Sequence, residues 1–207
     1  MKKNTFFITG IDTEIGKTLA STILVEALHA DYHKMIQAGI EERDTEFVKS
    51  MISNSKSHIH KESVLLKEPM SPHAAAELEN RSISLKDLTY PETNNEHLII
   101  EGAGGLMVPF NEKETFVDWL KFHPEIKIII VSKNYLGSIN HTMLTLEVLK
   151  QHGIPVYGII FNGKENKATE RVIKNKYSVR DLGRILPESE ITQQVVKRYS
   201  EQFKKKF

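Results

Sequence analysis

Short apolar runs of strand length recur along the chain. They lie at residues 6–8, 97–100, 127–131 and 156–161. The run KIIIV at 127–131 lacks polar–apolar alternation, which is typical of a strand that is covered on both faces. These runs predict the buried strands of a sheet.

Between these runs, apolar residues recur at helical spacing. Residues 19–28, 115–122 and 140–151 fit this pattern. Strands that alternate with helices predict an α/β fold with a mostly parallel sheet and helices on both faces. Ligands bind such sheets at the carboxyl ends of the strands. A chain of 207 residues is long enough for one such domain, which we expect to span residues 1–207.

The pattern is weaker in two regions. Residues 72–80 predict a short helix and residues 90–96 a polar connection. The end of the chain, residues 199–207, contains three consecutive lysines at 204–206 and is predicted to be a frayed helix or tail. Because nothing aromatic is interleaved with these lysines, we interpret them as solubilising and not as a nucleic-acid site.

Composition narrows the functional classes. Hydrophobic residues make up 40% and charged residues 27% of the chain, which is ordinary for a soluble globular protein. The net charge of +1 gives no bulk attraction to nucleic acid or to an anionic membrane. The chain has no cysteine, which fits a reducing cytoplasm. We expect a cytoplasmic protein with no nucleic-acid or membrane partner.

Residues 10–18, with the sequence GIDTEIGKT, have the pattern of a phosphate-binding loop. They follow the first apolar run and precede the first helical pattern, the context that this motif requires. Backbone N–H groups of the loop would face an anion, Lys17 would reach the outer phosphates, and the Thr18 hydroxyl would bind Mg²⁺. Five residues separate Gly10 from Gly16, one more than in the strict pattern. The loop predicts a P-loop NTPase that binds a nucleoside triphosphate.

A second candidate is Glu101, which closes the apolar run at 97–100 and precedes glycines at 102, 104 and 105. Carboxylate oxygen is the ligand that Mg²⁺ prefers, and a rigid strand end fixes its direction. The glycines permit close approach of backbone to a ligand. Next to a phosphate loop, Glu101 is therefore predicted to act on the metal and not merely to end a strand.

Other candidates carry less weight. His73, His123 and His141 are not at metal-ligand spacing, which argues against a zinc site. Nothing resembles a nucleophile elbow. By composition alone, Lys34 and Asp44 are charged residues of a polar loop.

Two other kinds of P-loop protein fit the chain poorly. GTPases recognise guanine with an Asn/Thr-Lys-x-Asp element, and residues 175–178 (NKYS) lack its aspartate, so adenine is the better prediction. Partition-type ATPases carry a second lysine early in the loop, where this chain has Asp12. We therefore do not expect the dimer-coupled hydrolysis of that family.

The motifs together resemble one family, the dethiobiotin synthetases, which are ATP-dependent carboxylases of biotin synthesis. Residues 10–18 resemble G-x-D-T-x-[VI]-G-K-T, and residues 68–73 (EPMSPH) resemble E-P-x-S-P-H. Residues 101–105 match E-G-A-G-G, and residues 136–141 (LGSINH) resemble L-G-x-I-N-H. The blocks occur in family order and extend over most of the chain, to about Pro187.

This resemblance implies a substrate, a reaction and partners. The substrate would be the diamine 7,8-diaminononanoate, used with CO₂, with ATP as co-substrate and with Mg²⁺. One amine would capture CO₂ as a carbamate, ATP would phosphorylate the carbamate, and the second amine would close the ring. No covalent enzyme intermediate is implied. The family also implies a homodimer with sites shared between subunits.

The resemblance assigns roles to individual residues. Lys17 and Lys34 would be catalytic, and Thr18, Asp44 and Glu101 would bind the metal. The implied ATP contacts are Glu14, Ile15, Gly16, Lys17, Thr18, Leu19, Asp44, Glu101, Gly102, Ala103, Gly104, Asn162, Gly163, Pro187, Glu188 and Ser189. The implied substrate contacts are Thr13, Lys34, Ala38, Gly137, Ser138, Ile139 and Asn140, the last four from the partner subunit.

One segment departs from the family pattern. After the first helix the family shows K-P-[VI]-x-[ST]-G, whereas residues 34–39 read KMIQAG, so that Met35 replaces the proline and Ala38 replaces a hydroxyl that contacts the diamine. Gln37 is a candidate for the missing polar contact. Two alternatives stay open. One is a related ATP-dependent ligase with another amine substrate, such as a cobyrinate-type amidating synthetase, which usually needs a cysteine. The other is a non-catalytic nucleotide switch.

Overall fold

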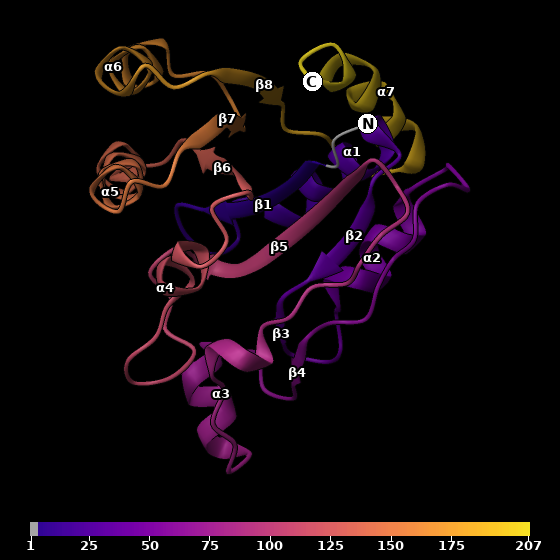
Figure 1. The fold of residues 1–207 in the computed structure, drawn as a ribbon. Coiled ribbons are helices and arrows are strands. Elements are labelled where there is room, and N and C mark those ends of the chain that lie inside the picture. Colours follow the sequence, from indigo (N-terminus) through magenta and orange to yellow (C-terminus); the bar gives the residue numbers. More distant parts are fainter. Residues whose placement is uncertain (1–3) are drawn as a thin grey trace.

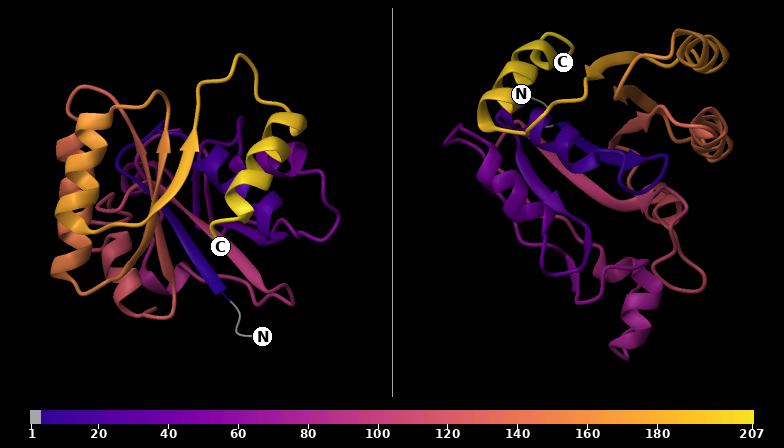
Figure 2. Two further views of the ribbon diagram at one scale, coloured as in Figure 1. Left: turned by 90° about the horizontal axis from the view of Figure 1, so that it is seen from above. Right: turned by 180° about the vertical axis from the view of Figure 1, so that it is seen from behind.

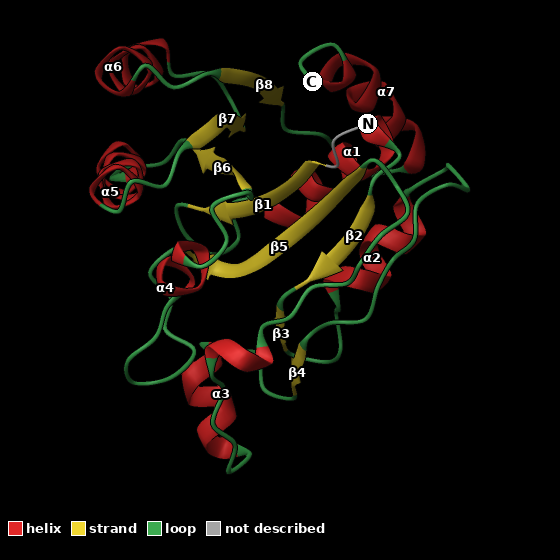
Figure 3. Cartoon of the chain, in the orientation of Figure 1, coloured by secondary structure: helices red, strands yellow, loops and turns green. Residues whose placement is uncertain are grey.

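The computed structural model describes residues 4–207, so the first three residues of the predicted domain lie outside the described part. Helices and strands alternate along most of this range (Figures 1 and 3). In chain order the elements are β1 (Asn4–Gly10), α1 (Lys17–Leu28), β2 (Asp31–Lys34), β3 (Ile36–Ala38), α2 (Asp44–Met51), β4 (Val64–Leu66), α3 (Pro72–Leu78), the 3₁₀ turn η1 (Leu85–Asp87), β5 (His97–Gly105), α4 (Phe116–Lys121), β6 (Lys127–Lys133), α5 (Ser138–Gln151), β7 (Val156–Asn162), α6 (Lys167–Tyr177), β8 (Asp181–Ile185) and α7 (Gln193–Lys204).

The main sheet has six strands in the order β2-β5-β1-β6-β7-β8, and every neighbouring pair is parallel. Helices α1, α2 and α7 lie on one face and α4, α5 and α6 on the other (Figures 1 and 2). The predicted single-domain α/β fold, a mostly parallel sheet covered on both faces, is thus confirmed. Strands β3 and β4 form a separate parallel pair beside it.

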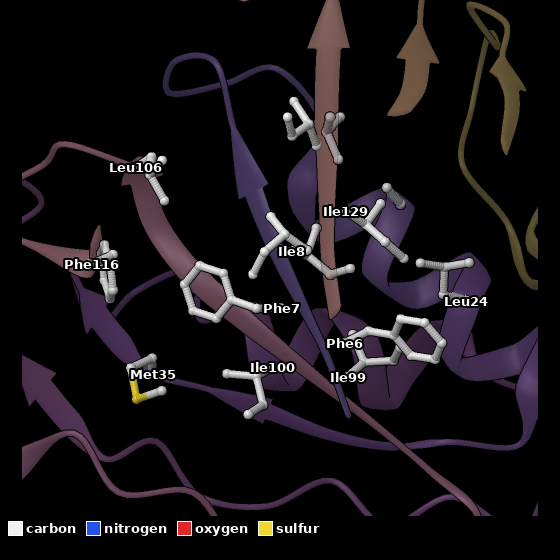
Figure 4. Close-up of a cluster of buried hydrophobic side chains, with 14 of the residues drawn as sticks. Phe6, Phe7, Ile8, Leu24, Met35, Ile99, Ile100, Leu106, Phe116 and Ile129 are labelled. Carbon is white, nitrogen blue, oxygen red and sulfur yellow. The ribbon is translucent and has the colours of Figure 1, made fainter. Parts of the chain in front are cut away.

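The core lies on both sides of the central strand β1 (Figure 4). Phe7 packs against Phe116 of α4 with ring centroids 5.6 Å apart, whereas Phe6 packs against Phe207, which follows α7, at 5.3 Å. Consecutive residues of a strand face opposite sides, so the apolar run of β1 fills both layers. This explains why the central strands lack polar–apolar alternation.

The polar elements were the ones that the sequence pattern did not predict. Asp31–Lys34 forms the edge strand β2, and Asp44 begins helix α2, so neither Lys34 nor Asp44 lies in a polar loop. In the parallel register of β2 and β5, Lys34 lies opposite Glu101. Strand β5 also continues to Gly105, so Glu101 lies within the strand and does not close it.

The prediction of a frayed end at residues 199–207 is wrong. Helix α7 runs from Gln193 to Lys204 and packs on α1. Its buried residues are Val196, Tyr199, Ser200 and Phe203, a spacing that puts all four on one face of the helix. Lys204 ends the helix and two further lysines follow it. In the sequence these lysines made an amphipathic helix resemble a basic tail.

Within residues 4–207, no helix has the length and apolar character needed to cross a membrane.

Candidate active site

The phosphate-loop segment, residues 10–18, connects β1 to α1 at the carboxyl ends of the central strands. Gly16 adopts a left-handed conformation with φ of 89° immediately before α1. A Cβ at this position would lie 2.2 Å from Nδ2 of Asn162. Any larger residue would therefore combine backbone strain with a clash, and the loop requires glycine here.

Lys17 is folded back over its own loop. Its Nζ donates to the Asp12 carbonyl oxygen at 2.9 Å, and the residue is 8% exposed. Burial lowers the pKa of Lys17 to about 8, against the opposing effect of the nearby Glu101 charge. Within residues 4–207 one carbonyl thus holds the ammonium beside the loop, and a phosphate oxygen would readily replace it.

Three oxygen-bearing side chains converge next to Lys17. The Thr18 hydroxyl lies 2.8 Å from Oδ1 of Asp44 and 3.0 Å from Oε1 of Glu101. They come from α1, α2 and β5, elements that the sheet topology brings to one point. A hydroxyl and two carboxylates form a suitable oxygen donor set for a hard cation such as Mg²⁺, which keeps several of its waters.

Lys34 lies against the same two carboxylates. Its Nζ donates to Oε1 of Glu101 at 2.9 Å and to the Gly102 carbonyl oxygen at 3.0 Å, and it forms a short ion pair with Oδ2 of Asp44. Burial alone lowers the pKa of Lys34, but the charges of Glu101 and Asp44 outweigh it and raise the pKa above its usual value. Conversely, burial raises the pKa of Asp44, but the charge and hydrogen bond of Lys34 together with the Thr18 hydrogen bond and the Lys17 charge outweigh burial and lower that pKa.

Tyr32 is a site residue that the sequence analysis missed. Its fully buried hydroxyl donates to Oε2 of Glu101 at 3.0 Å. Both carboxylate oxygens of Glu101 are therefore hydrogen-bonded, which compensates for its complete burial. The only sequence signal for Tyr32 is its position two residues before Lys34, which has meaning only once β2 is placed beside β5.

The two lysines and the three oxygen-bearing side chains line one pocket of about 730 Å³. The lining combines the phosphate loop and the carboxylates with apolar side chains. Its lining residues are Thr13, Glu14, Gly16, Lys17, Thr18, Lys34, Ile36, Gln37, Ala38, Glu42, Asp44, Pro69, Met70, Ser71, Pro72, Glu101, Ala103, Gly104 and Val108. Eleven residues that the sequence analysis assigned to the site lie in this set.

The Gln37 amide lies in the pocket lining and is hydrogen-bonded to backbone groups on both sides. Its Nε2 donates to the carbonyl oxygens of Ala38 and Gly39, at 3.3 and 3.1 Å, and its Oε1 accepts from the Asp44 backbone N–H at 3.1 Å. The amide is thus committed to the backbone. Among the described residues, the hydroxyl groups that line the pocket belong to Thr13, Thr18 and Ser71.

The remaining predicted nucleotide contacts lie outside this pocket. Asn162, at the end of β7, donates to the Ile15 carbonyl oxygen at 2.8 Å and so touches the back of the loop. Gly163 donates its N–H to Ile185 in the neighbouring strand at 2.7 Å. Glu188 accepts from Tyr199 of α7 at 2.6 Å, and Leu19 lines an adjoining hollow beside α2. Gly102 contributes its carbonyl to Lys34, and Pro187 and Ser189 flank Glu188 beyond β8.

Residues Gly137, Ser138, Ile139 and Asn140 also lie apart from the pocket of their own chain. Gly137 precedes α5 with φ of 99°, and the Ser138 Oγ accepts the Tyr135 N–H at 3.1 Å. Next to them, the hydroxyl of Tyr135 lies 3.0 Å from Oδ2 of Asp12. The first turn of α5 is therefore tied to the phosphate loop without entering the pocket.

The chain is similar to known proteins over nearly its whole length. A family model described as an AAA domain matches residues 4–195. The ATP-dependent dethiobiotin synthetase of Christiangramia forsetii is 50% identical over 202 residues, covering 97% of this chain and 96% of the relative. That of Cytophaga hutchinsonii is 46% identical over 201 residues, with the same coverage.

Among solved structures, the cell division ATPase MinD of Pyrococcus furiosus has a TM-score of 0.62 at 13% identity and covers 99% of both chains. A ParA family ATPase from Chlorobium tepidum has a TM-score of 0.58, also at 13% identity, covering 98% of this chain and 96% of that one. At this identity the likeness concerns the fold alone. The sequence relatives, in contrast, match along nearly the whole length, and the chain belongs to the ATP-dependent dethiobiotin synthetase family.

Proposed function

We propose that this protein catalyses the ATP-dependent closure of a ureido ring on 7,8-diaminononanoate with CO₂, giving dethiobiotin. The observation that carries the proposal is the meeting of a phosphate loop with Lys34, clamped between Asp44 and Glu101, in one pocket. A buried ammonium beside phosphate-binding groups suits a reaction in which ATP, an anion, phosphorylates a carbamate, which is also an anion. The relatives carry the name of this activity.

The metal part of the proposal concerns Thr18, Asp44 and Glu101, since the Thr18 hydroxyl lies 2.8 and 3.0 Å from the two carboxylates. They would hold Mg²⁺, and the chemistry that this ion supplies when bound is neutralisation of charge on the phosphates of ATP. Asp44 is kept ionised by Lys34. The donor set is therefore ready in the charge state that cation binding requires.

The proposed reaction has three steps. An amine nitrogen of the substrate attacks CO₂ and loses a proton, which gives a carbamate. The carbamate oxygen takes the γ-phosphoryl group of ATP, and ADP leaves. The second amine then attacks the carbonyl carbon, phosphate leaves, and loss of a proton completes the ring.

This chain's residues act by positioning and charge. The Lys34 ammonium lies where it can turn from the carboxylates to a carbamate, holding it and offsetting the charge that develops on it. Lys17 exchanges the Asp12 carbonyl for phosphate oxygens of ATP. Placing the carbamate in line with the γ-phosphate supplies the rest of the rate acceleration.

The substrate and the nucleotide base occupy opposite sides of the loop in this proposal. Pro69, Met70 and Val108 line an apolar wall of the pocket that suits the methylene chain of the diamine, with Thr13 and Ala38 beside it. Asn162, which donates to the Ile15 carbonyl oxygen of the loop, and the segment 187–189 would contact adenine on the other side.

The homodimer is also part of the proposal. Gly137–Asn140 would receive the substrate carboxylate at the start of α5 in the partner subunit's pocket, because these residues do not line their own. Leu136 next to them is fully exposed, and Leu144 on α5 is 55% exposed, as expected of apolar residues that a second subunit covers. The cytoplasmic location expected from the lack of cysteine completes the proposal.

The test is release of ADP by the purified protein with Mg²⁺, ATP and bicarbonate, with and without 7,8-diaminononanoate. We expect strong stimulation by the diamine and formation of dethiobiotin in equal amount to ADP. Stimulation by a different diamine would instead identify a related ligase. Nucleotide binding without any amine-dependent turnover would overturn the proposal and favour a nucleotide switch.

A further inference from the structure

We propose that Gln37 is the positioning residue that holds Asp44 in place for cation binding. The proposal rests on the proposed function, since it takes Asp44 as a ligand of the Mg²⁺ that accompanies ATP. It concerns a side chain that the sequence analysis considered only as a substrate contact.

The contact joins two elements that are separate in the fold. Gln37 lies on β3, and Asp44 is the first residue of α2. The Asp44 backbone N–H, one of the donors that a helix start leaves without an intrahelical partner, donates to Oε1 of Gln37 at 3.1 Å. Arg43, at the N-cap of α2, makes no capping hydrogen bond with its side chain within residues 4–207. Gln37 therefore caps helix α2 from strand β3.

The amide orientation of Gln37 is fixed by its surroundings. Its Nε2 faces two carbonyl oxygens, those of Ala38 and Gly39, at 3.3 and 3.1 Å. A flipped amide would set its oxygen against those carbonyls and its NH₂ against the Asp44 N–H, so every contact would become repulsive. Gln37 is 6% exposed, and the loss of these bonds would leave buried polar groups unpaired.

The contact completes the support of Asp44. The Asp44 carboxylate is already held from two sides, by the Thr18 hydroxyl at 2.8 Å and by Lys34. Those partners must rearrange when a cation and phosphates arrive, because they occupy the same carboxylate oxygens. Gln37 holds the backbone instead, and this contact can persist through binding. Groups that hydrogen-bond a metal-ligating residue fix its orientation in this way.

The decisive experiment measures Mn²⁺ binding by the EPR signal of the free ion, with a non-hydrolysable ATP analogue present. Gln37→Met keeps the length of the side chain and removes all three hydrogen bonds. We expect Mn²⁺ affinity to fall about 10-fold, the lower end for loss of a group that orients a metal ligand. Affinity for the analogue in the presence of EDTA should change less than about twofold, because the phosphate loop is untouched.

A matched control separates positioning from general loosening of α2. Thr45→Val removes another anchor of the same helix start, the hydrogen bond from Thr45 Oγ1 to Glu62 at 2.6 Å, without touching Asp44. We expect it to lower the melting temperature but to leave Mn²⁺ affinity unchanged. Equal loss of Mn²⁺ affinity in both variants, or no loss in Gln37→Met, would overturn the proposal.

Two further variants keep the outcome interpretable. Gln37→Asn retains the amide but is one methylene shorter, so it should also lower Mn²⁺ affinity. It replaces Gln37→Met as the test if that variant folds poorly. Asp44→Asn should weaken Mn²⁺ binding more than either. If Asp44→Asn has no effect on Mn²⁺ binding, Asp44 is not a metal ligand. If Mn²⁺ binds normally but the diamine is not turned over, the proposed function is wrong.

Discussion

At the residue scale, Lys34 distinguishes the proposed reaction from plain nucleotide binding. Lys34→Met should leave ATP affinity within a few-fold of wild type and lower diamine-dependent ADP release on the order of 10²-fold, the effect of losing one preorganised charge donor. ATP affinity and turnover are measured separately, by calorimetry and by coupled assay. Lys49→Met, an exposed lysine on α2, is the control and should change neither. An equal loss of binding and turnover would contradict the role given to Lys34.

His33 gives the fold a pH dependence of its own. Burial lowers the pKa of His33 to about 4, although the hydrogen bond to the Thr89 carbonyl opposes this. The ordinary pKa of histidine is about 6.5, so between about pH 6.5 and 4 the unfolded chain binds the extra proton. Stability is therefore complete above this window and falls as the pH drops through it, by roughly 3 kcal/mol for this residue.

The measurement for His33 is urea unfolding at several pH values across this window. His33→Gln should flatten the loss of stability relative to wild type. His152→Gln, at an exposed histidine, should follow the wild-type curve. A His33→Gln curve parallel to wild type would show that His33 is not buried in its neutral form.

At the element scale, the C-terminal helix is part of the core. Phe203 of α7 is 2% exposed, and its ring lies against Gly183 of β8. Phe203→Ala should cost about 3 kcal/mol in the free energy of unfolding, the usual range for a buried phenylalanine. Gln202→Ala, on the exposed face, should cost under about 0.5 kcal/mol. Chemical denaturation measures the free energy of unfolding of both variants. Similar small costs for the two substitutions would mean that helix α7 frays.

The predicted elements and the missed ones differ in a physical way. The strands at 127–131 and 156–161 are covered on both faces, so their apolar runs are continuous and can be recognised locally. Strand β2, with its sequence DYHK, is buried through specific polar partners instead: Tyr32 bonds Glu101, 69 residues away. No local pattern encodes such a partner.

The same distinction applies to the candidate site. The phosphate loop and Glu101 were predicted from residue types and spacing, because the chemistry requires glycines and a lysine at fixed offsets. Lys34 and Asp44 came from the family resemblance alone. The backbone partners of Gln37 could not be predicted, since the direction of an amide depends on which backbone groups surround it.

At the scale of the whole molecule, the proposed dimer makes a prediction. Leu136→Lys places a charge on a fully exposed apolar residue next to Gly137, where burial in an interface would be costly. We expect the wild type to sediment as a dimer at micromolar concentration. The variant should be a monomer with at least about 10-fold lower turnover, since a few buried anchor residues carry most of the binding energy of an interface. Leu78→Lys, at another exposed leucine, should remain dimeric. A monomeric and fully active wild type would contradict the shared site.

The clamp of Lys34 between two carboxylates also sets the charge at the centre of the pocket. Asp44 and Glu101 contribute two negative charges there, and Lys17 and Lys34 two positive charges. A lone divalent cation and a lone polyphosphate each meet a group of four side chains with no net charge to attract them. A metal–nucleotide complex matches this group better, since its cation would take the carboxylates and its phosphates would take Lys17. Electroneutrality thus makes ATP and its cation cooperative ligands of this pocket.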